Sequence, residues 1–427
     1  MHIAFTGGGT GGHIYPCLAI AELINYENKF TDSTLKAMYY IGNTGKLEED
    51  LVQRFDYMQF LGIEATKMPR KNSTSAELIK WLGIFHKAYR RSVKYIKQNK
   101  IDVVMGTGGY VAAPVFCACL ATNTKFLIHN LDSNFGLVNK IFRRFASKVT
   151  LGFPMKLALN KKYKYTGNPV SHSFVRVYDE LDPRNLFKKN KPKEKMFMGE
   201  LERSNFAENL QKKADRLKLI DEHCLRVIIS GGSQGSQFIN DCVGYLLKHF
   251  TELNDRIEVF GKRIKITHIT GNNLYKEHVD YYLDGDAKKY KNYKVMPYSH
   301  DMADLCKDAD VAICRAGAMT CSEMVMVQCI PIFFPLPWAA NNHQMRNAVA
   351  LSNYDCAFVI KQDQENTQKR YLDLFDLIIL LAKDTDLLVA MKKKLRRFAK
   401  PLASKEILGL LKFMSDSEAA AEETAND

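Results

Sequence analysis

Short runs of apolar residues alternate along the chain with longer stretches in which apolar residues recur every three or four positions. The run 2–5 has the pattern of a short buried strand, and Ile14, Leu18 and Ile24 have the spacing of a helix that follows it. The strand-like signal returns at 37–41, 102–105, 125–128, 149–151, 226–230, 264–267, 311–314 and 331–334. Strands that alternate with helices predict an α/β fold with parallel sheets.

The alternation is interrupted by a lysine-rich stretch at roughly 179–221 that has few strand-like runs. We therefore predict a Rossmann-like domain at 1–170, a basic linker or insertion at 171–222, and a second Rossmann-like domain at 223–365. Helices are expected at 366–414. The acidic, alanine-rich residues 415–427 are expected to form a disordered tail.

Composition narrows the class of protein. A hydrophobic content of 46% and a charged content of 25% are typical of globular domains. The net charge of +14 favours an anionic partner: nucleic acid, an acidic membrane surface or a phosphorylated substrate. The ten cysteines form no C-x-x-C pair, so we expect a reduced protein with neither disulfides nor a metal site. The apolar run 111–120 is too short to span a membrane, and we expect no signal peptide because a strand begins at once.

Three glycine-rich loops, Gly7–Gly12, Gly106–Tyr110 and Gly231–Ser236, each follow a predicted strand. Glycine lets the backbone approach a ligand, and a helix that starts there offers N–H groups to an anion. The first loop matches the dinucleotide pattern G-x-G-x-x-G, but the next strand-like run ends at 42–44 without the acid that would hold a ribose. NAD or FAD binding is therefore disfavoured, while the possibility that some of these glycines only make tight turns stays open.

Polar side chains near these loops have the chemistry that a sugar-nucleotide enzyme needs. His13 follows the first loop, and an ordinary histidine pKa near 6.5 suits a general base, although a histidine that only packs on the helix start is the alternative. Glu323 lies just past the strand at 311–314, where a carboxylate can accept hydrogen bonds from ribose hydroxyls or simply favour the helix start. No metal-binding D-x-D motif appears at the end of a predicted strand, so the helix N-terminus after the third loop, with Ser233, would have to stabilise a leaving diphosphate.

Six motifs follow one another in a specific order. They are Gly8–His13, Gly106–Val111, Thr166–Val170, Gly231–Gly235, Arg315–Glu323, and Asn342–Gln344 with Asn347-Ala348. The ordered set resembles the MurG family, UDP-N-acetylglucosamine:N-acetylmuramyl-(pentapeptide) pyrophosphoryl-undecaprenol N-acetylglucosaminyltransferases. The similarity runs from the first strand to about Ile360, apart from the middle insertion.

The resemblance implies a GT-B architecture, two Rossmann-like doubly wound domains facing across a cleft. It implies an inverting, metal-independent transfer without a cofactor, in which GlcNAc moves from UDP-GlcNAc to lipid I, a polyprenyl-diphosphate-linked muramoyl peptide, giving lipid II for peptidoglycan synthesis. His13 becomes the candidate base, with Asp132 as the alternative. The implied donor contacts are Thr10, Gly11, Gly12, Asp132, Ser171, Ser233, Gln234, Ser299, Ala318, Met319, Thr320, Cys321, Ser322, Glu323 and Gln344. The implied acceptor contacts are Gly8, Gly9, Gly108, Gly109, Tyr110 and His129.

The chain departs from the family pattern at two places. The family usually has His-Glu-Gln-Asn where this chain has His129-Asn130-Leu131-Asp132, so Asn130 cannot act as an acid and Asp132 would have to do so. The family usually has an arginine where this chain has Ser171, so His172 or Arg176 would have to neutralise phosphate instead.

The segment 76–87 has Leu78, Trp81, Leu82 and Phe85 on one helical face, and basic residues follow it. A basic amphipathic helix with aromatic residues suits an anionic membrane interface, and a core-facing helix is the alternative. A polyprenyl-linked acceptor favours the membrane interpretation, which would place the protein peripherally on the cytoplasmic face of the cell membrane.

Two other classes of function compete with this prediction. One is another GT-B sugar-nucleotide enzyme, with a different acceptor or with UDP-GlcNAc epimerase activity. The other is a nucleic-acid-binding protein, suggested by the net charge of +14. The chain contains no RNP, zinc-finger or helix-turn-helix signature, so we expect no nucleic-acid partner.

Overall fold

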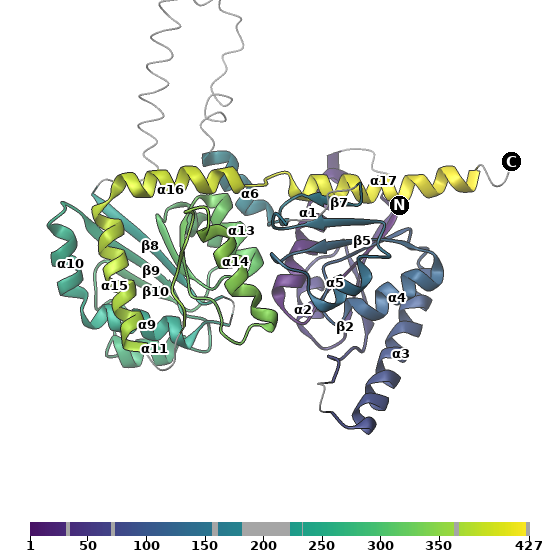
Figure 1. The fold of residues 1–427 in the computed structure, drawn as a ribbon, viewed down its shortest axis with the longest axis horizontal. Helices are drawn as coiled ribbons and strands as arrows, with labels where there is room; N and C mark the ends of the chain where they lie inside the picture. The colour runs from purple at the N-terminus through teal and green to yellow at the C-terminus, as the bar shows by residue number, and fades with distance from the viewer. Residues whose placement is uncertain are drawn as a thin grey trace, which may run out of the picture. The chain divides into compact units, whose positions relative to one another are not determined.

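The computed structural model describes residues 1–30, 35–69, 73–155, 161–181, 223–232, 234–362 and 367–423. It divides the chain into two compact units (Figure 1). Unit 1 comprises Met1–His172, the short segment Gly317–Ser322 and the chain from Lys400 onward, and unit 2 comprises Ser173–Ala316 and Glu323–Ala399. Ser233, residues 182–222 of the predicted insertion, and the last four residues lie outside the described residues.

Unit 1 is built on a seven-stranded parallel sheet with the strand order β3-β2-β1-β4-β5-β6-β7. Its strands are β1 (His2–Thr6), β2 (Ala37–Asn43), β3 (Gln59–Ile63), β4 (Val103–Gly106), β5 (Lys125–Asn130), β6 (Lys148–Leu151) and β7 (Tyr163–Tyr165). Its helices are α1 (Gly11–Phe30), α2 (Leu47–Val52), α3 (Ser75–Gln98), α4 (Ala112–Thr122), α5 (Leu137–Phe142) and α17 (Ala403–Glu423).

Unit 2 is built on a six-stranded parallel sheet with the order β10-β9-β8-β11-β12-β13. Its strands are β8 (Cys224–Ser230), β9 (Arg263–Ile269), β10 (Tyr293–Met296), β11 (Val311–Cys314), β12 (Ile330–Phe333) and β13 (Phe358–Val359). Its helices include α9 (Gln237–Lys248), α10 (Phe250–Glu258), α11 (Tyr275–Tyr282), α12 (Met302–Lys307), α14 (His343–Ser352), α15 (Thr367–Lys383) and α16 (Thr385–Phe398). Two more, α6 (His172–Leu181) and α13 (Ala318–Val327), begin in unit 1 and continue in unit 2.

The strand order of both sheets reverses direction at one point, between β1 and β4 in unit 1 and between β8 and β11 in unit 2. In doubly wound sheets, ligands bind outside the carboxyl ends of the strands at such a switch point. The loops at 7–12 and 106–110 follow β1 and β4, and the loop at 231–236 follows β8. The predicted α/β class with two doubly wound parallel sheets is therefore confirmed, and each unit has a glycine loop at its switch point.

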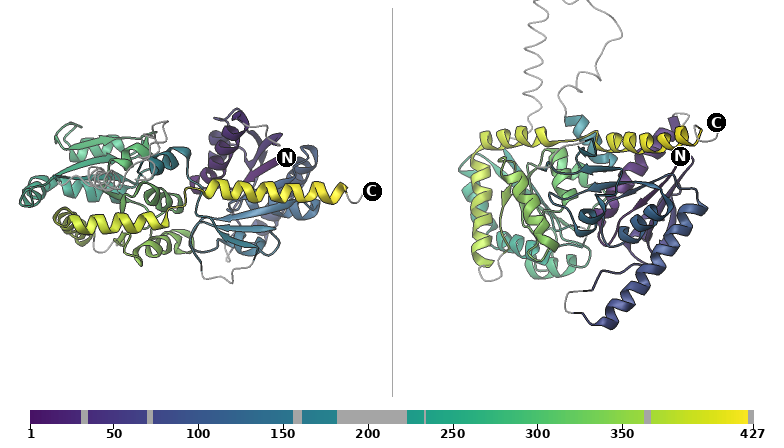
Figure 2. Two further views of the ribbon diagram at one scale, coloured as in Figure 1. Left: turned by 90° about the horizontal axis from the view of Figure 1, so that it is seen from above. Right: turned by 45° about the vertical axis from the view of Figure 1, so that its right-hand side comes forward.

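The core of unit 1 has two layers, one on each face of the sheet. Alternation along β1 puts Ile3 and Phe5 in one layer and Ala4 in the other. Helix α17 completes the first layer, burying its apolar residues Ile407, Leu408, Leu411 and Met414 beside those of α1. Figure 2 shows α17 in yellow along this unit. The last helix of the chain is therefore part of the N-terminal unit.

Helix α17 also corrects one boundary. The disordered tail was predicted to begin at Ser415, yet the helix continues to Glu423 and Ser415 itself is buried. The reason is that Met414 packs in the core of unit 1 and the alanines that follow are good helix formers.

Candidate functional site

The two glycine loops of unit 1 meet through their backbones at the switch point. Gly109 has φ of +77°, and a Cβ atom built on it would lie 2.4 Å from the carbonyl oxygen of Gly8. Glycine is therefore required there, and the backbones at 7–12 and 106–110 form one surface. The hydroxyl of Tyr40 donates to the carbonyl of Gly7 at 2.8 Å. This surface brings together the predicted residues Gly8, Gly9, Thr10, Gly11, Gly12, Gly108, Gly109 and Tyr110.

His13 lies in the first turn of α1, immediately after this surface, and is half-buried. Its backbone is held at both ends: its N–H donates to the carbonyl of Thr10 at 3.1 Å, and its carbonyl accepts from the hydroxyl of Thr107 at 2.6 Å. Thr107 belongs to the second loop, so both loops fix the start of α1. His13 as a base therefore stays a prediction, with its backbone fixed at the junction of the two loops.

His129 is not available to a ligand, and its prediction as an acceptor contact is wrong. The side chain is fully buried; Nδ1 lies 2.9 Å from the hydroxyl of Thr150, and Nε2 lies 2.9 Å from Oδ1 of Asn168. Burial lowers the pKa of His129 to about 4, so the ring is neutral at physiological pH. The amide of Asn168 also donates to the carbonyl of Leu131 at 3.2 Å. His129 thus positions the loop after β5 instead of contacting substrate.

Two of the residues that differ from the family pattern in this loop, Asn130 and Asp132, have separate roles. Asn130 is buried, and its amide donates to the backbone carbonyl of Asp132 at 2.8 Å. Its Oδ1 accepts a hydrogen bond from Asn139 at 3.2 Å. Asn130 therefore shapes the loop, and Asp132 is presented half-buried on it.

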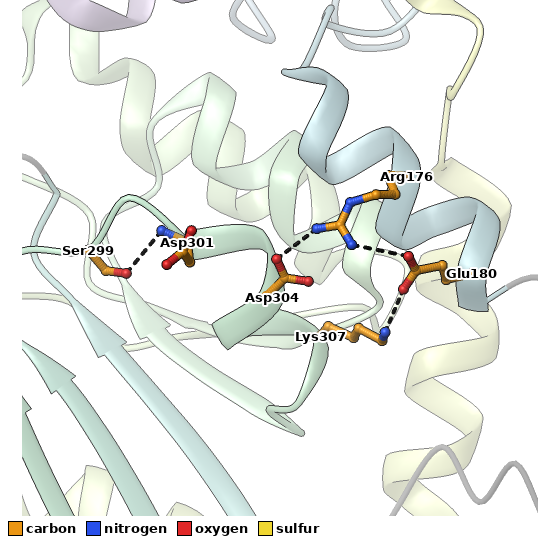
Figure 3. A network of polar contacts seen from close by, with 6 residues as sticks. All are labelled: Arg176, Glu180, Ser299, Asp301, Asp304 and Lys307. Atoms are coloured by element: carbon orange, nitrogen blue, oxygen red, sulfur yellow. Dashed lines mark hydrogen bonds and ion pairs between the residues drawn. The ribbon is translucent and has the colours of Figure 1, made fainter.

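Arg176 is engaged elsewhere and does not replace the missing arginine at Ser171. Its guanidinium pairs with Asp304 at 2.7 Å and with Glu180 at 3.1 Å, and Glu180 also pairs with Lys307 at 2.5 Å (Figure 3). This network joins α6 to α12. Nearby, the predicted donor contact Ser299 lies in the loop after β10, where its hydroxyl accepts from the backbone N–H of Asp301 at 3.1 Å. Ser171 is half-buried.

The glycine loop of unit 2 is held by an arginine that the sequence did not single out for this role. Ser236 caps α9, accepting from the N–H of Ile239 at 3.4 Å. Arg315, just after β11, donates to the same Ser236 hydroxyl at 2.6 Å and to the carbonyl of Phe334 at 2.9 Å. Burial lowers the pKa of Arg315 to about 10, which still leaves it charged at neutral pH. The position of Arg315 directly after a strand at the switch point is the signal that would have identified it. The predicted donor contact Gln234 is exposed on the glycine loop at 231–236.

The predicted donor contacts at 318–322 form the start of α13. Ala318, Met319 and Cys321 bury their side chains, so a ligand can reach them through backbone atoms alone, while Thr320 and Ser322 are half-buried. Within unit 1, the amide of Asn168 donates to the Ser322 hydroxyl at 2.9 Å.

Glu323 is the sixth residue of α13, past its first turn, and lies in unit 2. Burial raises the pKa of its carboxyl to about 7. Among the residues that the structure describes, none pairs with this carboxylate, so hydroxyl donors of a ligand would stabilise its charged form.

Gln344 lies in the first turn of α14, and its Oε1 accepts from the backbone N–H of Leu336 at 3.0 Å. This bond ties the loop after β12 to the first turn of α14.

The amphipathic segment is the first half of α3. Leu78 and Leu82 are 42% and 51% exposed, and the rings of Trp81 and Phe85 lie 5.4 Å apart on the same stretch. Ile79, which the sequence did not single out, is more exposed still. The core-facing alternative is therefore wrong for Leu78 and Leu82.

Two general findings concern metals and membrane spans. Within the described ranges, no three histidine, cysteine or acidic side chains are grouped so as to hold a metal ion. In the same ranges, no helix has the length and apolar composition required to cross a bilayer.

Comparison with known proteins assigns the family. The model of the glycosyltransferase family 28 N-terminal domain matches residues 3–151, and that of the C-terminal domain of the same family matches residues 226–407. The UDP-N-acetylglucosamine--N-acetylmuramyl-(pentapeptide) pyrophosphoryl-undecaprenol N-acetylglucosamine transferase of Desulfitobacterium hafniense is 31% identical over 96% of this chain and 98% of its own length. The same enzyme of Desulforamulus reducens is 30% identical over 96% of this chain and 97% of its own.

Solved structures share the fold. MurG of Acinetobacter baumannii matches with a TM-score of 0.66 at 24% identity, covering 96% of this chain and 99% of its own. A UDP-GlcNAc 2-epimerase of Neisseria meningitidis matches with a TM-score of 0.55 at 10% identity, covering 96% and 99%.

Two parallel sheets, each with a glycine loop at its switch point, and these two domain models define a glycosyltransferase of the GT-B class. Relatives of one kind match almost the whole chain, and the chain belongs to the MurG family of N-acetylglucosaminyltransferases. The resemblance drawn from the six ordered motifs is confirmed.

Proposed function

We propose that this protein transfers N-acetylglucosamine from UDP-GlcNAc to the muramoyl sugar of lipid I, giving lipid II for peptidoglycan synthesis. Membership in the family supports this reaction along nearly the whole chain. The structural observation that carries it is Glu323, a carboxylate of unit 2 whose pKa burial raises to about 7 and with which no described residue pairs. Hydroxyl donors such as those of a ribose are the partners it needs.

The proposed reaction is a single displacement with inversion. A base removes the proton of the acceptor hydroxyl, whose oxygen attacks C1 of GlcNAc from the face opposite the diphosphate. The bond from C1 to the diphosphate oxygen breaks, and UDP leaves with the electron pair. We assign the base to His13, and the backbone N–H groups of the loop at 231–236 and the start of α9 stabilise the charge that develops on the diphosphate. No step uses a metal or a cofactor.

We assign the acceptor to the backbone surface of the loops at 7–12 and 106–110, and the nucleotide to unit 2. There, Glu323 holds the ribose and Gln344 contacts the sugar, and backbone atoms of the helix start at 318–322 line the uracil. Asp132 is the alternative base, because Asn130 shapes its loop and has no carboxylate.

We further propose that the protein is peripheral on the cytoplasmic face of the cell membrane, where a polyprenyl-linked acceptor resides. The exposed Leu78, Ile79 and Leu82 at the start of α3 support this location. Arg90, Arg91 and Lys94 follow on the same helix and suit an anionic surface.

The test is incubation of the protein with labelled UDP-GlcNAc and a short-chain lipid I analogue, followed by separation of the products. A labelled disaccharide that forms only when the acceptor is added supports the proposal. Formation of the 2-epimer of GlcNAc without acceptor would indicate an epimerase instead, and absence of any product would refute the transferase.

A further inference from the structure

The loop between β12 and α14 is held in one shape by several independent constraints. The N–H of Leu336 donates to Gln344 at 3.0 Å, the N–H of Ala339 donates to the carbonyl of Leu336 at 3.2 Å, and the N–H of Asn342 donates to the carbonyl of Ala339 at 2.8 Å. Pro335 and Pro337 fix two further backbone dihedrals. The loop is therefore closed on the first turn of α14.

This shape is obtained at an energetic cost. Asn341 and Asn342 are consecutive residues in the left-handed region, with φ of +54° and +53°. Asparagine tolerates that region better than most side chains, but two such residues in succession are unusual. Strained backbone of this kind is maintained where the surrounding structure requires it, and it concentrates at ligand sites.

The loop presents Trp338, one of two tryptophans in the chain, with 65% of its surface exposed. Single exposed apolar residues are ordinary, and exposure alone would mean nothing. Here, however, the exposed indole lies two residues after Leu336, whose N–H is bonded to the side chain assigned to the sugar. The strained loop thus carries the indole of Trp338 close in sequence to Gln344, whose side-chain amide is a hydrogen-bond donor.

That combination matches the chemistry of a hexopyranose. One face of the sugar ring carries C–H groups that pack on an aromatic plane, while its hydroxyls take hydrogen bonds from amides. We propose that the indole of Trp338 contacts the N-acetylglucosamine ring of the donor. This contact strengthens the binding of UDP-GlcNAc and leaves the binding of UDP unaffected. The inference rests on the proposed function and adds a contact residue for the sugar.

The test compares UDP-GlcNAc with UDP in calorimetric titrations of wild type, Trp338→Ala and Trp338→Phe. Loss of one aromatic packing contact predicts that Trp338→Ala binds UDP-GlcNAc roughly fivefold more weakly, with UDP affinity within about twofold of wild type. Trp338→Phe keeps an aromatic face and is expected to retain most of the affinity. Tyr281→Ala is the matched control, because Tyr281 is 68% exposed on α11, outside this loop, and both affinities should be unchanged.

Equal weakening of UDP and UDP-GlcNAc by Trp338→Ala would overturn the inference, because Trp338 would then support the loop as a whole. Unchanged donor affinity, or an effect confined to the KM of the acceptor, would overturn it as well. The disaccharide assay on wild type distinguishes failure of the Trp338 assignment from failure of the proposed function. If wild type forms the disaccharide while Trp338→Ala binds UDP-GlcNAc normally, the Trp338 assignment fails alone; if wild type neither binds UDP-GlcNAc nor transfers it, both fail.

Discussion

The two sheets have the same topology, but they hold their glycine loops in different ways. In unit 1 the loops at 7–12 and 106–110 touch backbone to backbone, hydroxyls of Tyr40 and Thr107 bind carbonyls, and the carboxyl group of Glu48 lies against the first loop. In unit 2 a charged residue, Arg315, holds the cap of α9, and the carboxylate of Glu323 follows β11. A strand, a glycine loop and a helix are therefore a shared scaffold, and the side chains around them decide what binds.

This difference explains why the dinucleotide pattern at 7–12 is misleading. The pattern describes how closely a backbone can approach a ligand, which both units need. The acid that should accompany it is absent from the tip of β2, and the residue that we propose for this role, Glu323, lies in the other unit. The comparison predicts that changes in unit 1 affect turnover and changes in unit 2 affect nucleotide affinity.

The largest effect is expected from His13→Ala. Removal of a general base typically costs 10²–10⁴-fold, so kcat should fall by roughly that factor while the affinity for UDP stays close to wild type. Steady-state kinetics and a UDP titration on the same preparation measure both quantities. Asp132→Asn is the companion variant: if it abolishes turnover and His13→Ala does not, the base lies on the loop after β5.

Glu323→Ala tests the opposite half of the comparison. Hydrogen bonds to a charged group contribute about 1.5–3 kcal/mol, so the KM for UDP-GlcNAc should rise roughly 10- to 100-fold, with the KM for the acceptor little changed. Kinetics with each substrate varied in turn separate the two constants. A rise in the acceptor KM alone would reverse the assignment of the two units.

The amphipathic first half of α3 gives a third test, because changes there should affect neither turnover on a soluble acceptor nor nucleotide affinity. Trp81→Glu combined with Phe85→Glu places charges among exposed apolar residues, and loss of even one large apolar contact with lipid predicts at least about tenfold weaker binding to anionic vesicles. Vesicle sedimentation measures this, and activity on a water-soluble acceptor analogue should persist. Unaltered sedimentation, or an unfolded variant, would show that these rings serve the core.

The smallest effect is expected on stability. Burial raises the pKa of Glu323 to about 7, so the folded state holds this proton more tightly than the unfolded chain does. The resulting stabilisation is complete below the ordinary glutamate pKa of about 4.5 and is lost as the pH rises through about 7. Glu323→Gln should therefore raise the melting temperature by roughly 2–4 °C at about pH 8 and change it little at about pH 4. An equal gain at both pH values would mean that titration is not the cause.

Strands buried at the centre of each sheet were predictable, and several strands further out were not. The runs that became β1, β4, β8 and β11 are continuously apolar because both faces are covered. The strands at the edges of the two sheets, β3, β7, β10 and β13, were missed, and β13 is just two residues long. Their residues are partly exposed or polar, so they lack the hydrophobic signal on which the prediction depends.

The candidate site shows a similar limit. The positions of His13, Glu323 and Gln344 after strands or at helix starts follow from local patterns. The burial of His129 does not, because it depends on Thr150 and Asn168, which lie 21 and 39 residues away. The engagement of Arg176 with Asp304, 128 residues away, is likewise a property of the folded unit alone.

Helix α17 has a consequence for how this chain acquires its structure during synthesis. One layer of the first sheet's core contains Ile407, Leu411 and Met414, which leave the ribosome after almost all of unit 2. Domains usually fold in the order in which they are made. Here the N-terminal unit cannot complete its core until the end of the chain has emerged. Ile14 and Leu18 on α1 pack against residues of α17 that are synthesised nearly 400 residues later. Expression of residues 1–170 alone would therefore leave that face of the sheet uncovered.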